Sequence, residues 1–177
     1  MADIVRLART SRRTFYAQFA DRDACFLALF EETSERIMAQ VADAVDPAAQ
    51  PEAQVDQALD AYLDAVLAHP ALHLSFVREL PALGEAGAAR QRAVIEHFAE
   101  LLVVLVEAGR RAHPELDAQP LSLDVAVVIV GGVRELMVIS AQQGRDLRDL
   151  RASAAQAVTA IVEGTVLGAR RLAPRRG

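Results

Sequence analysis

The sequence predicts an all-α fold of about nine helices, and two observations carry this prediction. Apolar residues recur at helical spacing, and no stretch alternates between apolar and polar residues as a half-buried strand would. Proline, glycine and helix-capping residues divide the chain into segments of helical length. With 177 residues, of which 53% are hydrophobic, the chain is long and apolar enough to bury a core.

The first part of the chain is predicted to hold three helices. Thr10 or Ser11 is suited to cap the second of these, and Asp21 to cap the third, because their side-chain oxygens can accept from free backbone N–H groups. Asp46-Pro47 ends the third helix, since proline removes a donor and restricts the residue before it. The expected helical ranges are 2–8, 11–19 and 21–45.

Further along the chain, the same residue types set the boundaries. Pro51 suits the first position of a helix, and Pro70 separates two others. Gly84 and Gly87 are expected in a loop, and Ser122 caps a long apolar helix. The expected ranges are 51–68, 70–79, 88–112, 122–143 and about 146–172.

Composition narrows the class of protein. One cysteine excludes an intrachain disulfide framework. The most apolar run, at 126–133, is far shorter than the roughly 20 residues of a membrane-spanning helix. No signal peptide is visible at the N-terminus. We therefore expect a soluble, cytoplasmic protein with no membrane partner.

Charge is distributed unevenly along the chain. The whole chain has a net charge of −5, yet residues 1–23, which we call the head, sum to +2. The remainder, residues 24–177 or the body, is therefore strongly acidic. A basic head on an acidic body fits either a solvated basic face or a local contact with nucleic acid.

The head has the layout of a helix-turn-helix motif, with two short helices around a tight turn and a long helix after them. In such motifs the second helix enters the major groove of DNA. Here it begins Ser11-Arg12-Arg13-Thr14, so that arginines can reach guanine edges or phosphates. Phe15 and Phe19 lie four residues apart and are expected to pack inward.

The stretch ADIVRLARTSRRTFYAQFADRDACFLALF resembles the second to fourth helices of the tetracycline-repressor (TetR/AcrR) family of transcription regulators. The T-F-Y-x-x-F core, the loop and the basic residue before a long helix carry the likeness. Ser11 can cap the second helix and leave backbone N–H groups facing a phosphate. The resemblance implies that Thr14, Tyr16 and Arg22 contact phosphates. It implies base reading by Arg12, Arg13, Ala17 and Gln18.

The chain departs from the family pattern at three points. Arg9 stands where the family usually has glycine in the turn, and we expect a turn there that needs no left-handed residue. Gln18 replaces a common histidine. The family's first helix is absent from this sequence. Either the natural start lies upstream of Met1, or residues 1–23 form an under-packed, partial DNA-binding domain with weakened operator binding.

The body, 24–177, is expected to bind a ligand and to dimerise. Large or polar residues on otherwise apolar helices are pocket candidates, although each alone is more often a core or solvated residue. These candidates are Met38, Tyr62, Phe76, His97, Phe98, Arg134 and Met137. Arg134 could pair with Glu135, Glu79 or an anionic ligand. Few polar groups suggest a largely apolar effector, and no cofactor or metal is expected.

A stripe of small residues near the C-terminus predicts a homodimer, as the resemblance does. Its expected members, with their apolar flanks, are Ala157, Val158, Ala160, Ile161, Gly164 and Gly168. A two-fold dimer would place two heads on half-sites about 34–36 Å apart, so the operator is expected to be nearly palindromic.

Two functions other than a regulator were considered, an enzyme and a DNA-independent module. His69 and His73 have a metal-ligand spacing, but Pro70 separates them and no HExxH pattern follows, so an enzyme is not expected. A DNA-independent helical dimer that binds a small molecule or a partner protein is the alternative. The favoured interpretation is a ligand-responsive regulator, most often a repressor. In it, the effector moves the long helix over about 22–45 and so changes the separation of the two recognition helices.

Overall fold

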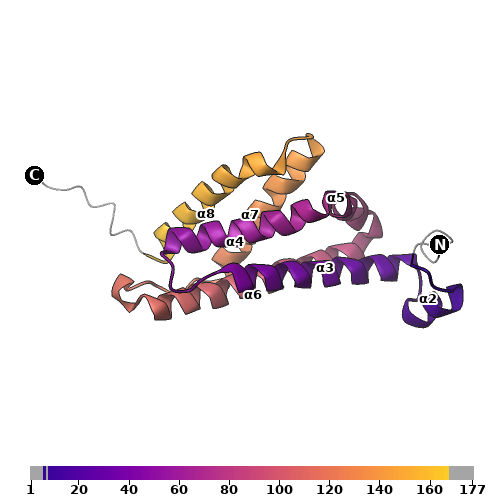
Figure 1. Cartoon of the computed structure of the whole chain (residues 1–177), viewed down its shortest axis with the longest axis horizontal. Helices are drawn as coiled ribbons and strands as arrows, with labels where there is room; N and C mark the ends of the chain where they lie inside the picture. Colours follow the sequence, from indigo (N-terminus) through magenta and orange to yellow (C-terminus); the bar gives the residue numbers. More distant parts are fainter. Residues whose placement is uncertain (1–5, 7, 168–177) are drawn as a thin grey trace, which may run out of the picture.

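The computed structural model describes residue 6 and residues 8–167, and these residues form helices and no strand (Figure 1). The all-α prediction is therefore confirmed. The α-helices are α2 Arg12–Gln18, α3 Arg22–Ala44, α4 Pro51–Ala68, α5 Pro70–Glu79, α6 Gly84–Ala112, α7 Leu123–Gln142 and α8 Arg151–Thr165. Three short 3-10 helices join them, namely η1 Leu80–Leu83, η2 Pro114–Leu116 and η3 Leu147–Leu150. The helix expected over 2–8 lies almost wholly outside the described residues, so the count of about nine is not confirmed.

Local capping explains why most boundaries fall where the sequence places them. The backbone N–H of Thr14 donates to Ser11 Oγ at 3.0 Å. The N–H of Ala24 donates to Asp21 Oδ1 at 2.7 Å. Ser122 caps α7 in the same way, and Pro51 and Pro70 occupy first-turn positions of their helices.

The prediction of a loop around Gly84 and Gly87 is wrong, because α6 begins at Gly84. Gly84 has φ +59°, a left-handed value that lets the chain turn out of η1. A Cβ on Gly87 would lie 2.2 Å from the Leu80 carbonyl oxygen. Gly87 is thus needed for close packing of α6 on η1.

The single last helix expected over about 146–172 is also wrong. Asp146 caps a separate 3-10 turn by accepting from the N–H of Arg148 at 2.9 Å, and Leu150 at its end is buried. The α-helix that follows ends at Thr165. Just beyond it, the Val166 carbonyl accepts from the N–H of Gln119 at 2.6 Å. A tertiary hydrogen bond therefore holds the chain where the helix stops.

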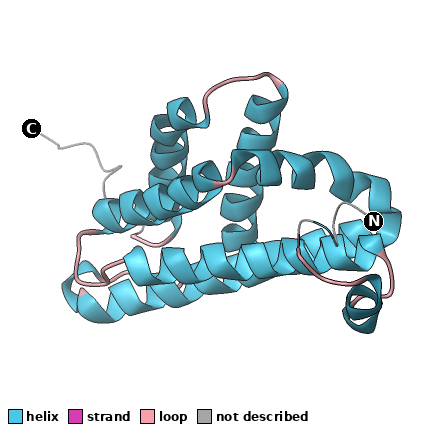
Figure 2. Ribbon diagram, turned by 45° about the vertical axis from the view of Figure 1, so that its right-hand side comes forward, coloured by secondary structure: helices cyan, strands magenta, loops and turns pink. Residues whose placement is uncertain are grey.

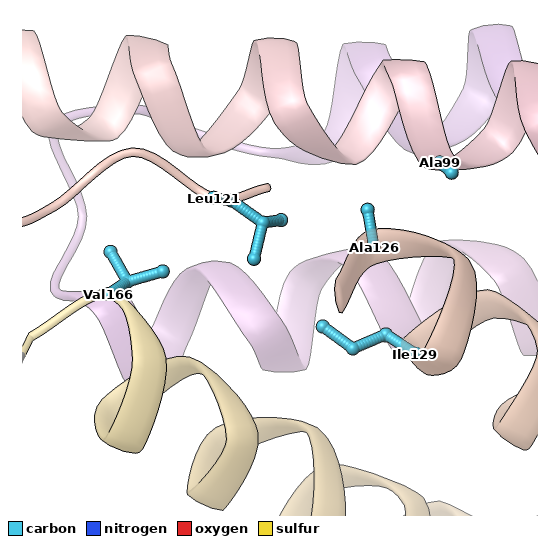
Figure 3. Packing of buried hydrophobic residues seen from close by; sticks show 5 residues of the cluster. All are labelled: Ala99, Leu121, Ala126, Ile129 and Val166. Carbon is cyan, nitrogen blue, oxygen red and sulfur yellow. The ribbon is translucent and has the colours of Figure 1, made fainter. Parts of the chain in front are cut away.

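Two apolar clusters hold the body together. One contains Ala99 and Ala126, which have no exposed surface and allow α6 and α7 to approach closely. Figure 3 shows these alanines facing the same space as Leu121, Ile129 and Val166. The second cluster, around Ile37, Val41 and Val66, joins α3 to α4 and is covered by residues of α6 and α7.

The head and the body share one helix. Figures 1 and 2 place α2 at one end of the molecule, beside the start of α3 and away from α7 and α8. α3 begins at Arg22, in the head, and runs for 23 residues into the body. At about 1.5 Å per residue it spans about 35 Å. None of the described helices is long and apolar enough to cross a membrane.

Candidate functional site

The exposed surface of α2 is the first candidate site, and it rests on a small aromatic core. Phe15 is 5% exposed, and its ring lies 5.4 Å from that of Phe19. Tyr16 packs edge-on against Phe15 yet remains 55% exposed. Phe15 thus packs inward as predicted, whereas Phe19 is only half-buried.

The structure brings all the predicted DNA-contacting residues to the surface. The exposed residues are Ser11, Arg12, Arg13, Thr14, Tyr16, Ala17, Gln18 and Arg22. Arg12 and Arg13 make no ion pair with any described residue, and α2 contains no acidic side chain. Arg22 differs, since its Nε lies 3.3 Å from Asp23 Oδ1.

Hydrogen bonds fix the start of α2. The hydroxyls of Ser11 and Thr14 lie 2.8 Å apart, in addition to the capping bond from the Thr14 N–H. Arg9, in the turn before, has φ +49°. The expectation of a turn without a left-handed residue is therefore wrong, and arginine holds a conformation that costs a non-glycine residue about 1–3 kcal/mol.

A cavity inside the body is the second candidate site. It has a volume of about 440 Å³, within the usual range for ligand pockets. One face of α3 lines it at every turn, from Phe30 through Ile37 to Val45. Residues of α4, α5, α6, α7 and α8 and of the segments between them complete the wall, which is mostly apolar.

Five of the seven predicted pocket residues line this cavity. They are Tyr62, Phe76, Phe98, Arg134 and Met137. Met38 is half-buried and His97 is exposed, and neither lines the cavity. Both sit on helices that contribute to the wall, but on other faces, which the sequence could not distinguish without knowing how the helices pack.

Several polar lining residues were not predicted as pocket residues. Gln54 donates to the Ala49 carbonyl at 2.8 Å, and Ser34 donates to the Phe30 carbonyl at 2.8 Å, so both are occupied structurally. His73 lines the cavity beside the ring of Phe76. In the sequence, the spacing of His73 from His69 suggests only a metal-ligand pair and not a place in a pocket.

Burial changes the protonation of two cavity groups. Burial lowers the pKa of His73, and nearby His69 lowers it further, so His73 is neutral at neutral pH. Burial raises the pKa of the Tyr62 hydroxyl, and the positive charge of Arg134 partly opposes this effect. Tyr62 also packs edge-on against Phe98, with ring centroids 6.0 Å apart. Both Tyr62 and Arg134 line the cavity.

Of the two protein partners suggested for Arg134, the structure pairs it with Glu135 and not with Glu79. Arg134 Nη1 lies 3.4 Å from Glu135 Oε2, and the arginine side chain remains 30% exposed. No group of three or more His, Cys, Asp or Glu side chains within the described residues is arranged to hold a metal ion.

The predicted dimer face divides into two parts. Ala157, Ala160 and Gly164 are exposed on α8. Val158 and Ile161 are half-buried against the cluster around Ala126 rather than fully outward. Gly168 lies outside the described residues.

Comparison with known proteins adds no identity, since no family model, curated protein or solved structure matches the chain.

Proposed function

We propose that the protein is a DNA-binding transcriptional regulator of the TetR type, a ligand-responsive repressor that acts as a homodimer. The observation that carries the proposal is the exposed, unpaired pair Arg12 and Arg13 at the capped start of α2. The N-terminus of a helix carries a partial positive charge, so its interaction with a cation is unfavourable. The position of these arginines is therefore better explained by a polyanionic partner. The proposal includes no catalytic step.

The shared helix α3 supports coupling between ligand and DNA. Its first residue, Arg22, belongs to the head, and its cavity face runs from Phe30 to Val45. A ligand that prefers one position of α3 would shift the population of dimers toward one separation of the two heads. Operator affinity would change only by the ligand's difference in affinity for the two states.

The outer face of α8 supports a two-fold dimer. Its exposed residues carry no charge, and they are Ala152, Ser153, Gln156, Ala157, Ala160, Gly164 and Thr165. A Cβ at Gly164 would meet nothing within 4 Å, so another helix has room to approach. On the preceding helix, Val128 is also exposed, at 62%.

The DNA-binding part is tested by gel-shift titration on the DNA flanking the protein's own gene, at fixed salt. Arg13→Ala is expected to weaken operator binding by about 1–3 kcal/mol and to relax preference at one base pair. Arg36→Ala is the matched control, since Arg36 is exposed on the body part of α3. Unchanged binding by the Arg12→Ala, Arg13→Ala double variant would contradict the proposal.

The dimer is tested by sedimentation. Ala160→Arg is expected to yield monomers, whereas Ala39→Arg, an exposed alanine on α3, is expected to leave the dimer intact. A stable dimer that binds no DNA would favour the DNA-independent helical module.

A further inference from the structure

The cavity wall has a charge pattern opposite to that of the chain. The protein carries 24 acidic residues and a net charge of −5. Among the described residues that line the cavity there is no Asp or Glu, yet there are three arginines, Arg110, Arg134 and Arg145. A buried cation would find no counter-charge in this wall, whereas an anion would.

The three arginines differ in their freedom to bind. Arg110 is occupied, since its Nε donates to the Ala118 carbonyl at 2.7 Å and its Nη1 pairs with Glu107. Arg134 contacts only its sequence neighbour Glu135, at 3.4 Å. Adjacent residues do not share a helix face, so this contact is weakly constrained. Arg134 can therefore turn to a ligand at little cost.

Tyr62 supplies a second donor at the same place. Its hydroxyl has no hydrogen-bond partner among the described residues, and the half-buried residue lines the cavity. The hydroxyl oxygen is not enclosed by protein atoms, so it can donate to a ligand in the cavity. Tyr62 and Met137 pack against the same apolar cluster, and Arg134 lies one turn before Met137 on α7, so Arg134 and Tyr62 border the same region of the cavity. An acceptor between the two side chains would satisfy both.

The rest of the cavity is long and apolar. Along α3 its lining runs from Phe30 to Val45, and along α6 from Gln91 to Arg110. At about 1.5 Å per residue these stretches extend about 22 Å and 28 Å. The wall therefore suits an extended apolar chain better than a compact polar molecule.

We infer that the cavity binds a monoanionic amphiphile, a carboxylate with a long unbranched apolar tail. Arg134 and the Tyr62 hydroxyl hold its carboxylate, and the cavity between α3 and α6 holds its tail. A charge-assisted bond from arginine and a phenol bond together fix the head group, while apolar burial supplies most of the affinity. This inference rests on the ligand-responsive body of the proposed function, and not on its DNA-binding head.

The test is calorimetric titration of the full chain, without DNA, with dodecanoate, dodecan-1-ol and dodecyltrimethylammonium below their micelle concentrations. Dodecanoate is expected to bind tightest and the ammonium weakest. Arg134→Gln is expected to weaken dodecanoate binding about ten- to hundredfold and to leave dodecan-1-ol unchanged. Tyr62→Phe is expected to weaken it about three- to tenfold.

Controls separate the site from general effects on the fold. Arg92→Gln removes an exposed arginine of α6 that does not line the cavity, and it is expected to bind as the native protein does. Circular dichroism checks that each variant is folded, and Tyr62→Phe keeps the test decisive should Arg134→Gln be unstable.

Two results would overturn the inference. One is equal binding of the alcohol and the carboxylate by the native protein. The other is a loss of binding with Arg145→Gln but not with Arg134→Gln, which would move the head group to Arg145, an exposed residue of the cavity wall that makes no ion pair with a described residue. Either result leaves gel-shift titration of the operator unaffected, so the two proposals fail separately.

Discussion

The head and the body use the same residue, arginine, in opposite ways. On α2, Arg12 and Arg13 are exposed and have no counter-charge among the described residues. In the body, Arg134 faces a cavity, and Arg151 joins α8 to α4 through Asp60. An arginine on a small surface helix meets solvent or a partner, whereas one on a packed helix must find an anion within the protein or a ligand.

The two aromatic cores give the largest expected contrast. Phe76 is 4% exposed and packs against the rings of Phe26 and Phe30, so Phe76→Ala is expected to lower the free energy of unfolding by about 3–5 kcal/mol. Phe15→Ala is expected to speed hydrogen exchange of the α2 amides while leaving global unfolding within about 0.5 kcal/mol. Urea unfolding and hydrogen exchange measure the two effects.

Leu29→Ala is the control for both variants, because Leu29 is an exposed apolar residue of α3 and its truncation should be nearly neutral. If Phe15→Ala lowers global stability as much as Phe76→Ala does, head and body unfold as one unit and the contrast fails.

The turn before α2 offers a smaller, stabilising change. Arg9 holds φ +49°, so Arg9→Gly is expected to stabilise the head by about 1 kcal/mol, after the added freedom of glycine in the unfolded chain is subtracted. Arg9→Ala removes the same charge but keeps the strain. Slower exchange of α2 amides in the glycine variant alone would support this, and equal exchange in the two would contradict it.

His113 predicts a pH effect confined to the body. Its Nδ1 lies 3.0 Å from Glu115 Oε1 and its Nε2 lies 3.0 Å from the Ala49 carbonyl oxygen. Both nitrogens face acceptors, so the ring is favoured with both protonated. The Glu115 carboxylate, with the two backbone carbonyls, raises the pKa of His113.

The raised pKa of His113 sets the direction in which stability changes with pH. The stabilisation is present below the ordinary histidine pKa of 6.5 and is lost as pH rises through the raised value. The native protein should therefore exceed His113→Gln in thermal stability at pH 6 by more than at pH 9. His97→Gln, at an exposed position on α6, is the matched control. A constant difference for His113→Gln would contradict the assignment.

The smallest expected effect concerns the surface link between α4 and α8. The hydrogen bond from Arg151 lowers the pKa of Asp60, so its stabilisation is present above 3.8 and is lost as pH falls through the lowered value. Asp60→Asn should be slightly less stable than the native protein at neutral pH, and the difference should vanish in acid. Asp56, 3.3 Å from Arg151, will limit the loss. Asp64→Asn, one turn further along α4, is the control, and an equal effect there would remove the role of Arg151.

The all-helical class and most helix boundaries could be predicted from the amino-acid sequence alone. Ser11, Asp21 and Ser122 cap the helices they were expected to cap, and Pro51 and Pro70 begin theirs. These features depend on hydrogen bonds and backbone restrictions within three or four residues, so they can be predicted locally. The exposed arginines of α2 were predictable for the same reason.

The cavity lining and the helix boundaries that differ from the prediction depend on tertiary packing. His73 and Arg145 join the cavity wall, and His97 does not, because helix packing determines which face of each helix turns inward. Gly87 sits inside α6 because η1 folds back against it. The last helix ends at Thr165, beside a backbone bond between Val166 and a residue nearly fifty positions earlier. Contacts between residues distant in sequence leave no local periodicity, and the sequence alone could not place them.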